Sequence, residues 1–343
     1  MTSAQKLFNN LIGVLNSRQK EVICGRFGLD NKGEGETLAA IGDRMHVTRE
    51  RVRQIEKSAI DTLSRNISKD PYCVQIIARS KKYLKEAGGV AKNDILLGGL
   101  KDIANDLGDH HLALLTEASP AFYYYAQDDD FWPFYYLSKD DLKTATNFID
   151  GWVSYLKEHK PKILDGAYAE SLKDFSKTKS TNKNHAESYL SISKKICKNP
   201  YGDTGLRDWS EIKPMTTRDR IYLVLKKKTE PLHFEDIART INETGFGCQI
   251  ALAPTVHNEL IKDERFVLVG RGVYALREHG YEPGIAREVI QKILRQIGPL
   301  KPNDVITHVA KQRFFKPNTV LINLQNKNFF ERLPDGRYRV RES

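Results

Sequence analysis

The sequence predicts a mainly α-helical protein with small β-hairpins, in which an N-terminal helix-turn-helix is followed by about three winged-helix-like modules. Three observations lead to this fold class. Two short helical patterns stand close together near the N-terminus, one helix–break–helix pattern recurs three times, and alternating residues around tight turns follow it. Since 343 residues are too many for one ordinary core, we expect two to four domains.

The first helical pair lies between residues 37 and 63. Apolar residues recur there at steps of three and four, which are Leu38, Ile41 and Met45 in the first helix and Val52, Ile55, Ala59 and Leu63 in the second. Only His46 and Val47 separate the two patterns, and Thr48 is a suitable N-cap for the second helix. Two short helices with a tight break are typical of a helix-turn-helix.

The second helix of this pair carries its charged residues away from the apolar stripe. Arg49, Glu50, Arg53 and Gln54 fall together on one face. In the DNA major groove, arginine can bond bidentately to guanine, glutamine can do so to adenine, and glutamate can accept from cytosine. This face therefore predicts base reading, and the alternative is a solvated amphipathic helix with chance charges.

Longer motifs extend over residues 15–63, with LNSRQKEVICGRFGLD followed by TLAAIGDRMHVTRERVRQIEKSAIDTL. This segment resembles region 4 of the primary bacterial sigma factors, the module that binds the −35 promoter element. The resemblance implies RNA polymerase core as a partner and places Arg49, Glu50, Arg53 and Gln54 at base-reading and adjacent backbone positions. The full set of predicted DNA-binding residues in this helix is Thr48, Arg49, Glu50, Arg51, Arg53, Gln54 and Lys57.

The segment departs from the family at His46, where the family usually has glycine. Because histidine tolerates a positive φ better than most residues, we expect the turn to survive. About 14 residues precede the resemblance, whereas the primary sigma factors carry an aromatic-rich domain there that clamps the polymerase and melts the −10 element. We therefore expect a sigma-like factor or a sigma-related regulator instead of an ordinary sigma factor.

A degenerate internal repeat occupies the rest of the chain. Residues 82–97, 223–238 and 293–306 share an apolar helix, a Gly or Pro break, and an Asp-Ile or Asp-Val pair that opens the next helix. The second and third copies continue with helix candidates at Pro254–Lys262 and Asn318–Gln325, and then with alternating residues around a Gly turn or Asp-Gly. This is the order of elements in a winged helix.

The second copy resembles a known family from about Thr217 to Tyr281, where it reads RDRIYLVLKKKTEPLHFEDIARTI and then TVHNELIKDERFVLVGRGVYAL. It looks like the HARE-type helix-turn-helix, a winged helix also found in the delta subunit of bacterial RNA polymerase and in chromatin and restriction proteins. The zero net charge of residues 214–282 favours a protein partner for it.

The third copy is basic, since residues 283–343 carry a net charge of +7. This charge favours DNA binding by the third copy, and the alternative is a basic but unengaged surface. The predicted DNA-binding residues there are Lys316, Asn318, Thr319, Arg332, Arg337 and Arg339.

Aromatic residues flank an acidic turn at residues 121–138, AFYYYAQDDDFWPFYYLS. We expect a wing hairpin whose aromatic side chains fill a core. A surface that stacks bases is the alternative, and the acidic turn disfavours it because it would repel phosphate. We expect helix over 141–170 and a flexible linker at 176–186, which lacks large apolar side chains.

These patterns predict five domains or segments. They are a region-4-like helix-turn-helix at 1–70, a winged-helix-like module with the aromatic hairpin at 71–140, a helical connector and linker at 141–213, a HARE-type winged helix at 214–282, and a basic winged-helix-like module at 283–343.

Composition narrows the class of function. The formal net charge of +10 and the pI near 9.2 favour an anionic partner, for which double-stranded DNA is the usual choice. The four cysteines lack C-x-x-C spacing, which indicates a reducing compartment. The N-terminus has no signal-peptide pattern and no run of about 18 apolar residues occurs. We expect a cytoplasmic, nucleoid-associated protein with no membrane partner.

The motifs of common enzyme classes are missing, including the P-loop, the Rossmann fingerprint, G-x-S-x-G and H-E-x-x-H. We therefore expect no enzymatic activity, no cofactor, no metal site and no small-molecule substrate. The leading hypothesis is promoter recognition in transcription initiation. The alternatives are an RNA polymerase accessory subunit that binds through the HARE-type module and a repressor that acts independently of polymerase.

Overall fold

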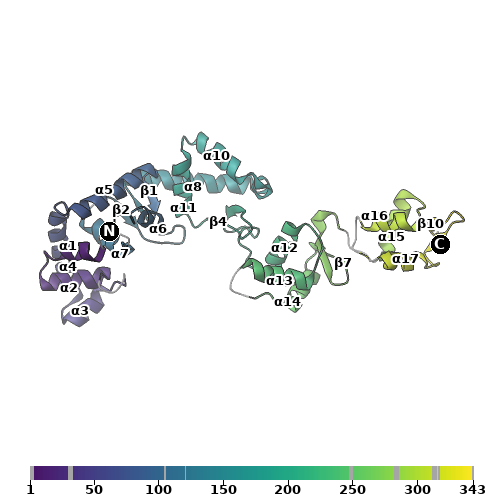
Figure 1. Ribbon diagram of the computed structural model, residues 1–343, viewed down its shortest axis with the longest axis horizontal. Helices are drawn as coiled ribbons and strands as arrows, with labels where there is room; N and C mark the ends of the chain where they lie inside the picture. Colours follow the sequence, from purple (N-terminus) through teal and green to yellow (C-terminus); the bar gives the residue numbers. More distant parts are fainter. Residues whose placement is uncertain are drawn as a thin grey trace. The chain divides into compact units, whose positions relative to one another are not determined.

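Helices dominate the chain, and the strands form only short antiparallel sheets (Figure 1). The predicted fold class, mainly α with small β-hairpins, is confirmed. The chain divides into two units, residues 1–197 with 204–207, and residues 198–203 with 208–343. The computed structural model describes residues 4–29, 34–103, 106–119, 121–246, 250–281, 286–310, 315 and 317–341.

The helix-turn-helix module contains α1 (Ala4–Ile12), α2 (Ser17–Phe27), α3 (Leu38–Met45) and α4 (Arg49–Ile67). The side-chain oxygen of Thr48 accepts a hydrogen bond from the N–H of Arg51 at 3.2 Å, so Thr48 is the predicted N-cap of α4. Val22, Ile41 and Val52 are fully buried against one another and hold α2, α3 and α4 together.

Two residues determine the turn between α3 and α4. His46 has φ 55° and ψ 42°, a left-handed conformation, so the turn forms with histidine as expected. Gly42 approaches the next segment closely, because a Cβ added there would lie 2.7 Å from the carbonyl oxygen of Val47. The N–H of Val47 donates to the carbonyl of Gly42 at 2.9 Å. The short break therefore needs a small residue at position 42.

The first winged-helix module follows α4 directly. Its elements are α5 (Pro71–Glu86), β1 (Val90–Lys92), α6 (Asn93–Gly98), α7 (Asp109–Ala118), β2 (Tyr123–Tyr125) and β3 (Phe134–Tyr136). The strands pair antiparallel in the order β1-β3-β2. The three helices and the hairpin follow the expected order, and strand β1 is an addition that the sequence did not predict.

One hydrophobic core joins the helix-turn-helix module to the first winged-helix module. It contains Phe8 of α1, Ile23 of α2, Leu63 of α4, Leu115 of α7 and Tyr135 of β3, each at most 2% exposed. Helix α7 holds the position of a recognition helix, yet it packs against α2 and α4. The core thus continues across residue 70, and α7 serves as a support for the helix-turn-helix.

The aromatic hairpin forms the wing of the first module. Phe122, Phe134 and Tyr135 are buried, as expected for aromatic side chains that fill a core. Other aromatic side chains of the wing are 42–45% exposed, and these are Tyr123, Tyr124 and Trp132. Phe134 and Tyr135 point to opposite faces of β3 and lie in two different cores, so the expected packing holds for part of the hairpin only.

The helical connector contains α8 (Lys139–Glu158), α9 (Lys160–Lys162), the π-helical turn η1 (Ile163–Ala167), α10 (Tyr168–Thr178) and α11 (Lys183–Ile192). The helix predicted over 141–170 is confirmed, with a break at Gly166, whose φ is 97°. The flexible linker predicted at 176–186 is wrong, because α10 and α11 occupy most of it. Ala186 and Tyr189 of α11 are buried in a core with β1 and α8, and this tertiary packing outweighs the polar composition.

The second winged-helix module follows a two-stranded sheet of β4 (Ile196–Lys198) and β5 (Thr204–Leu206). Its elements are α12 (Thr217–Lys228), β6 (Leu232–His233), α13 (Phe234–Thr244), α14 (Ala253–Lys262), β7 (Phe266–Gly270), β8 (Val273–Leu276) and the 3-10 turn η2 (Arg277–His279). The strand order β6-β8-β7 repeats that of the first module. The helix predicted at Pro254–Lys262 is confirmed as α14.

The third winged-helix module contains α15 (Ala286–Ile297), α16 (Pro302–Ala310), α17 (Pro317–Leu324), β9 (Phe330–Arg332) and β10 (Tyr338–Val340). A bridge between Leu300 and Tyr338 takes the place of the first strand. The predicted turn is present, with Gly336 at φ 83°. The repeated aspartate lies in the first turn of α6, α13 and α16, which confirms the internal repeat.

Candidate DNA-binding surface

The predicted reading face of α4 is exposed along its first three turns. Its apolar side is buried, since Val52, Ala59 and Leu63 have no exposed surface. All the predicted DNA-binding residues of this helix are exposed, and these are Thr48, Arg49, Glu50, Arg51, Arg53, Gln54 and Lys57. The helix therefore presents a polar surface that the rest of its module does not cover.

Glu50 and Arg53 form a bidentate pair on this face. The Arg53 Nη2 donates to Glu50 Oε1 at 2.7 Å and its Nε donates to Oε2 at 2.9 Å. The hydrogen bond from Arg53 lowers the pKa of Glu50, and the same contact raises the pKa of Arg53. Both side chains are nearly 60% exposed, so water competes with the pair and either group can exchange its partner for a base edge.

The remaining polar side chains of α4 differ in the hydrogen bonds and ion pairs that they make. The Nη1 of Arg51 donates to the Oε1 of Gln54 at 3.1 Å, and Gln54 must release this bond to pair bidentately with adenine. Arg49 and Lys57 make no ion pair within the described part of the chain. Their cations are therefore available for phosphate contacts beside the reading face.

Exposed ion pairs also join α4 and α3 to neighbouring parts of the module. Arg26 of α2 donates to Glu56 of α4 at 3.2 Å. Arg44 of α3 lies 3.0 Å from Glu21 and 3.2 Å from Glu36. These positioning contacts were not predicted, because each joins residues from different elements and no spacing in the sequence signals them. The cations of these ion pairs, Arg26 and Arg44, do not belong to the reading face of α4.

The third winged-helix module brings only some of its predicted residues together. Asn318 is exposed at the start of α17, Thr319 is half-buried, and Lys316 lies outside the described residues. The exposed arginines of the wing are Arg332, Arg337 and Arg339.

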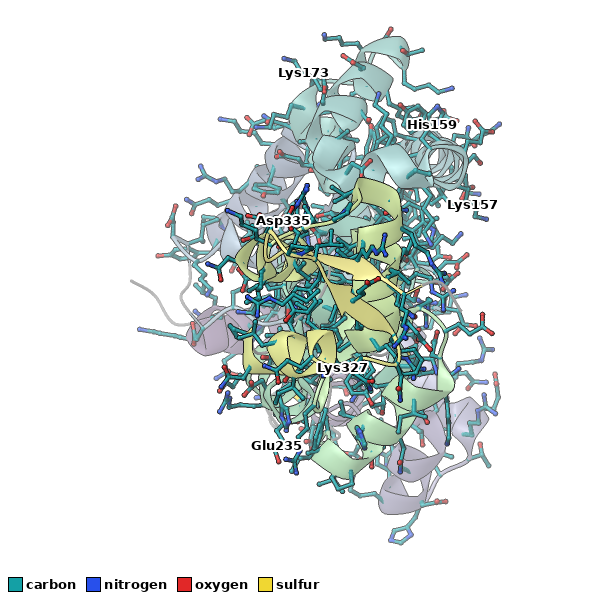
Figure 2. The ribbon with its side chains drawn as sticks, turned by 90° about the vertical axis from the view of Figure 1, so that its right-hand side faces the viewer. Lys157, His159, Lys173, Glu235, Lys327 and Asp335 are labelled. Carbon is teal, nitrogen blue, oxygen red and sulfur yellow. The ribbon has the colours of Figure 1, made fainter. Side chains whose placement is uncertain are left out.

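Two of these wing arginines have carboxylate partners. Arg337 lies 2.7 Å from Asp335, and Arg339 lies 2.7 Å from Glu331 on the paired strand. Arg332 makes no ion pair with another described residue. Figure 2 views this yellow module from the front and labels Asp335 in the turn of the wing. The wing therefore presents a mixed surface in which Arg332 is the least compensated of the three cations.

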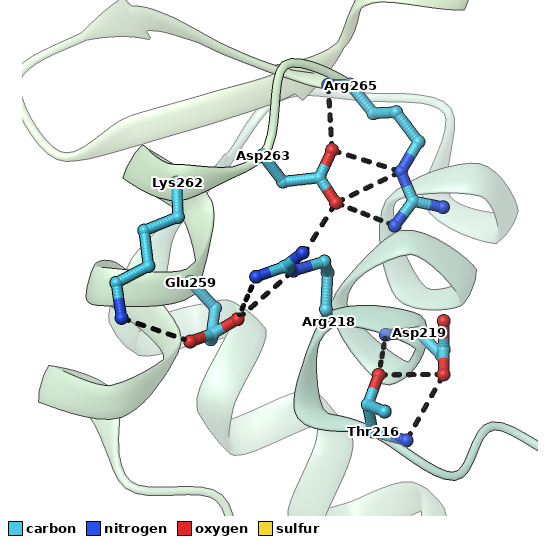
Figure 3. Close-up of polar contacts among 7 residues, drawn as sticks. All are labelled: Thr216, Arg218, Asp219, Glu259, Lys262, Asp263 and Arg265. Carbon is cyan, nitrogen blue, oxygen red and sulfur yellow. Dashed lines mark hydrogen bonds and ion pairs between the residues drawn. The ribbon is translucent and has the colours of Figure 1, made fainter.

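The second winged-helix module uses its charges internally, as Figure 3 shows. Arg218 of α12 contacts Glu259 at 2.8 Å and Asp263 at 3.5 Å. Asp263 also binds Arg265 at 2.7 Å, and Glu259 lies 3.6 Å from Lys262. The network ties the start of α12 to the end of α14, and it leaves few cations for phosphate.

Large apolar side chains are exposed on the same module, before α14, on it and on the wing strand β7. They are Ile250 at 78%, Leu252 at 61%, Ile261 at 63% and Leu268 at 53% exposed. Exposed apolar side chains around a helix are typical of protein–protein contacts and poorly suited to phosphate. The recognition-helix region of this module thus differs chemically from α4.

The aromatic wing of the first module carries its own compensating cations. The ammonium groups of Lys92 and Lys194 lie 5.2 Å and 4.9 Å from the centre of the Trp132 ring. Lys195 lies 2.9 Å from Asp130 in the acidic turn. The exposed indole is therefore already engaged by cations of the chain itself.

No group of three or more His, Cys, Asp and Glu side chains that could hold a metal ion occurs in the part of the chain that the structure describes. Among those residues, no helix is both long and apolar enough to cross a membrane.

Comparison with known proteins gives matches at the N-terminus. Residues 11–65 match the family described as Sigma-70, region 4. The chain is 41% identical over 63 residues to RNA polymerase sigma factor SigA2 of Synechococcus elongatus, which is 18% of this chain and 19% of that protein. It is 48% identical over 59 residues to SigA4 of the same organism, covering 17% and 18%, and 52% identical over 54 residues to RpoD of Helicobacter pylori, covering 16% and 8%.

The chain spans less than a fifth of the length of these curated relatives. No solved structure matches it. The matched segment contains α2, α3 and most of α4, so it holds the whole reading face described above. The resemblance carried by residues 15–63 is thereby confirmed, and the first segment of the chain is related to region 4 of the sigma-70 factors.

Proposed function

We propose that this chain is a sequence-specific DNA-binding protein of transcription initiation, either a sigma-like factor or a sigma-related regulator. Helix α4 enters the major groove of a −35-like promoter element, with Arg53 and Gln54 on base edges. The exposed polar face of α4, inside a segment that matches sigma-70 region 4, is the observation that carries this proposal. Thr48, Arg49, Arg51 and Lys57 hold the adjacent phosphates.

RNA polymerase core is the proposed protein partner. The relatives that match residues 11–65 are named as RNA polymerase sigma factors. A chain that reads promoter DNA and touches the polymerase acts where transcription begins, which is in the cytoplasm at the nucleoid.

The basic third module, with Lys316, Asn318, Thr319, Arg332, Arg337 and Arg339, adds further DNA contacts.

Promoter-dependent transcription in vitro tests this function. The assay uses core polymerase from the source organism, with and without the chain, and with and without the primary sigma factor. Specific initiation by the chain and core alone makes it a sigma factor, and altered output only with the primary sigma factor makes it a regulator. Unchanged output in all combinations, together with sequence-specific DNA binding, would assign it to repressors that act independently of polymerase.

A second candidate function is that of an RNA polymerase accessory subunit. We propose that residues 214–282 form a HARE-type module that binds protein. The ion-paired charges around Arg218 and the exposed side chains of Ile250, Leu252 and Ile261 favour this role. Loss of co-purifying core polymerase in the full-chain variant Ile250→Asp/Leu252→Asp would support it, and unchanged co-purification would assign the contact to the region-4-like segment.

We propose that each of the five predicted segments has its own role. Residues 1–70 read DNA, 71–140 support them, 141–213 connect, 214–282 bind protein and 283–343 hold DNA.

A further inference from the structure

The third winged-helix module is hollowed between the end of α17 and its wing. The hollow has a volume of about 710 Å³. Its lining includes the cations Lys327, Arg332, Arg339 and Arg341, together with the carboxylate of Glu331. Lys327 and Arg341 were not predicted as DNA-binding residues, because they stand at the two outer ends of the hairpin and meet only when it folds. Figure 2 labels Lys327 on the face that the module turns toward the viewer.

Most of the positive charge in this hollow lacks a compensating carboxylate. Arg339 pairs with Glu331 at 2.7 Å, and the Nη1 of Arg341 donates to the main-chain oxygen of Lys327 at 2.9 Å. The side chains of Lys327 and Arg332 make no ion pair within the residues that the structure describes. Like charges that gather at one place repel one another, and a bound anion offsets that repulsion.

The second winged-helix module provides an internal comparison. There Arg265, just before the wing, is paired with Asp263 at 2.7 Å, and Arg218 of α12 and Lys262 of α14 also have carboxylate partners (Figure 3). The same strand order thus occurs once with an ion-paired arginine at the base of the wing and once with cations facing a hollow. Winged-helix topology therefore does not by itself explain the charge at the hollow.

We infer that this hollow binds the phosphodiester backbone of duplex DNA, without reading its sequence. The planar guanidinium groups of Arg332 and Arg341 match the geometry of phosphate oxygens, and Lys327 adds a point charge. The aromatic side chains of Phe330 and Tyr338 form part of the lining. This inference rests on the proposed function, because duplex DNA is the ligand proposed for the whole chain.

The salt dependence of DNA binding tests the inference. The full chain and the double variant Lys327→Gln/Arg341→Gln are titrated with one duplex at several salt concentrations. The plot of log binding constant against log salt should lose about 1.8 units of slope, since each phosphate contact contributes about 0.9. Base preference should stay that of the parent. The control Arg295→Gln/Lys301→Gln removes two exposed cations of the same module outside the hollow and should leave the slope unchanged.

Each outcome has one meaning. A double variant with the slope and affinity of the parent would overturn the inference, provided that its thermal unfolding matches the parent. An unchanged slope with loss of polymerase binding would overturn it too, by making the hollow a protein site. A reduced slope in a chain that shows no base preference would support the hollow and contradict the proposed reading by α4. Absence of any DNA binding by the parent would overturn both.

Discussion

Single residues of α4 carry the proposed reading of base pairs. Arg53 offers two parallel donors, and its bidentate pair with Glu50 holds the guanidinium beside the first turn of the helix. A guanidinium held by such a pair loses less conformational freedom when it meets guanine. We therefore propose that Glu50 positions Arg53 and accepts from cytosine when that pair opens.

The titration of Glu50 tests this pair. Arg53 lowers the pKa of Glu50 in the folded chain. The pair therefore stabilises the folded chain at pH values above the ordinary pKa of 4.5, and this stabilisation is lost as the pH falls through the lowered pKa. In NMR titrations, the carboxyl of Glu50 should titrate below 4.5 in the parent and return toward 4.5 in Arg53→Ala. The same midpoint in both proteins would mean that the pair does not form in solution. Arg65→Ala, at the far end of α4, is the control.

His46 is the residue on which the tight turn depends. Its φ of 55° is costly for a β-branched side chain, so His46→Val should lower the free energy of unfolding by about 1–2 kcal/mol. His46→Gly is the matched control and should be neutral or slightly stabilising. Chemical denaturation of the two variants measures the difference. Equal stability of the valine and glycine variants would show that the left-handed turn is not populated.

At the scale of elements, α7 joins the helix-turn-helix module to the module that follows it. In the first module this helix packs on α2 and α4, whereas the corresponding α14 of the second module is bordered by exposed apolar residues. Helix α7 thus supports α4, the helix for which we propose DNA reading. The orientation of α4 thus depends on a helix more than 40 residues further along the chain.

A cavity in α7 should therefore weaken two modules at once. Leu115 is 1% exposed, and Leu115→Ala should cost about 2–5 kcal/mol. Hydrogen exchange should show loss of protection in α2 and α4 as well as in α5 and β3, because they share one core. Protection in α12 to α14 should be that of the parent. A loss confined to residues after 70 would contradict a shared core.

The sequence predicted the elements better than their packing. The recurring Asp-Ile or Asp-Val pair and the Gly turns located helix starts and hairpin turns, because the first turns of helices and tight turns are local features. The partner of α7 could not be predicted, since periodicity indicates that a face is apolar and not what covers it. For the same reason, the sequence predicts a linker over 176–186, although this range contains the start of α11 and Ala186 is buried there. The ion pairs Arg26–Glu56 and Arg337–Asp335 could not be predicted either, and they occupy arginines that the sequence alone leaves open for DNA contacts.

At the scale of the whole molecule, the same topology occurs three times with three surface chemistries. The first module is packed against the helix-turn-helix, the second has ion-paired charges and exposed apolar side chains, and the third has a cationic hollow. We propose that α4 reads the sequence and that the third module binds the phosphate backbone. Variants of the two should therefore change different properties of DNA binding.

The central claim is that α4 reads base pairs. The most direct test selects preferred sites from randomised duplexes and then measures binding to single base-pair variants, for the parent, Gln54→Ala and the control Arg65→Ala. We predict a defined site for the parent and a loss of about 1–3 kcal/mol of discrimination at one position for Gln54→Ala, with the control unchanged. No selected site, or the same discrimination in all three proteins, would contradict the claim.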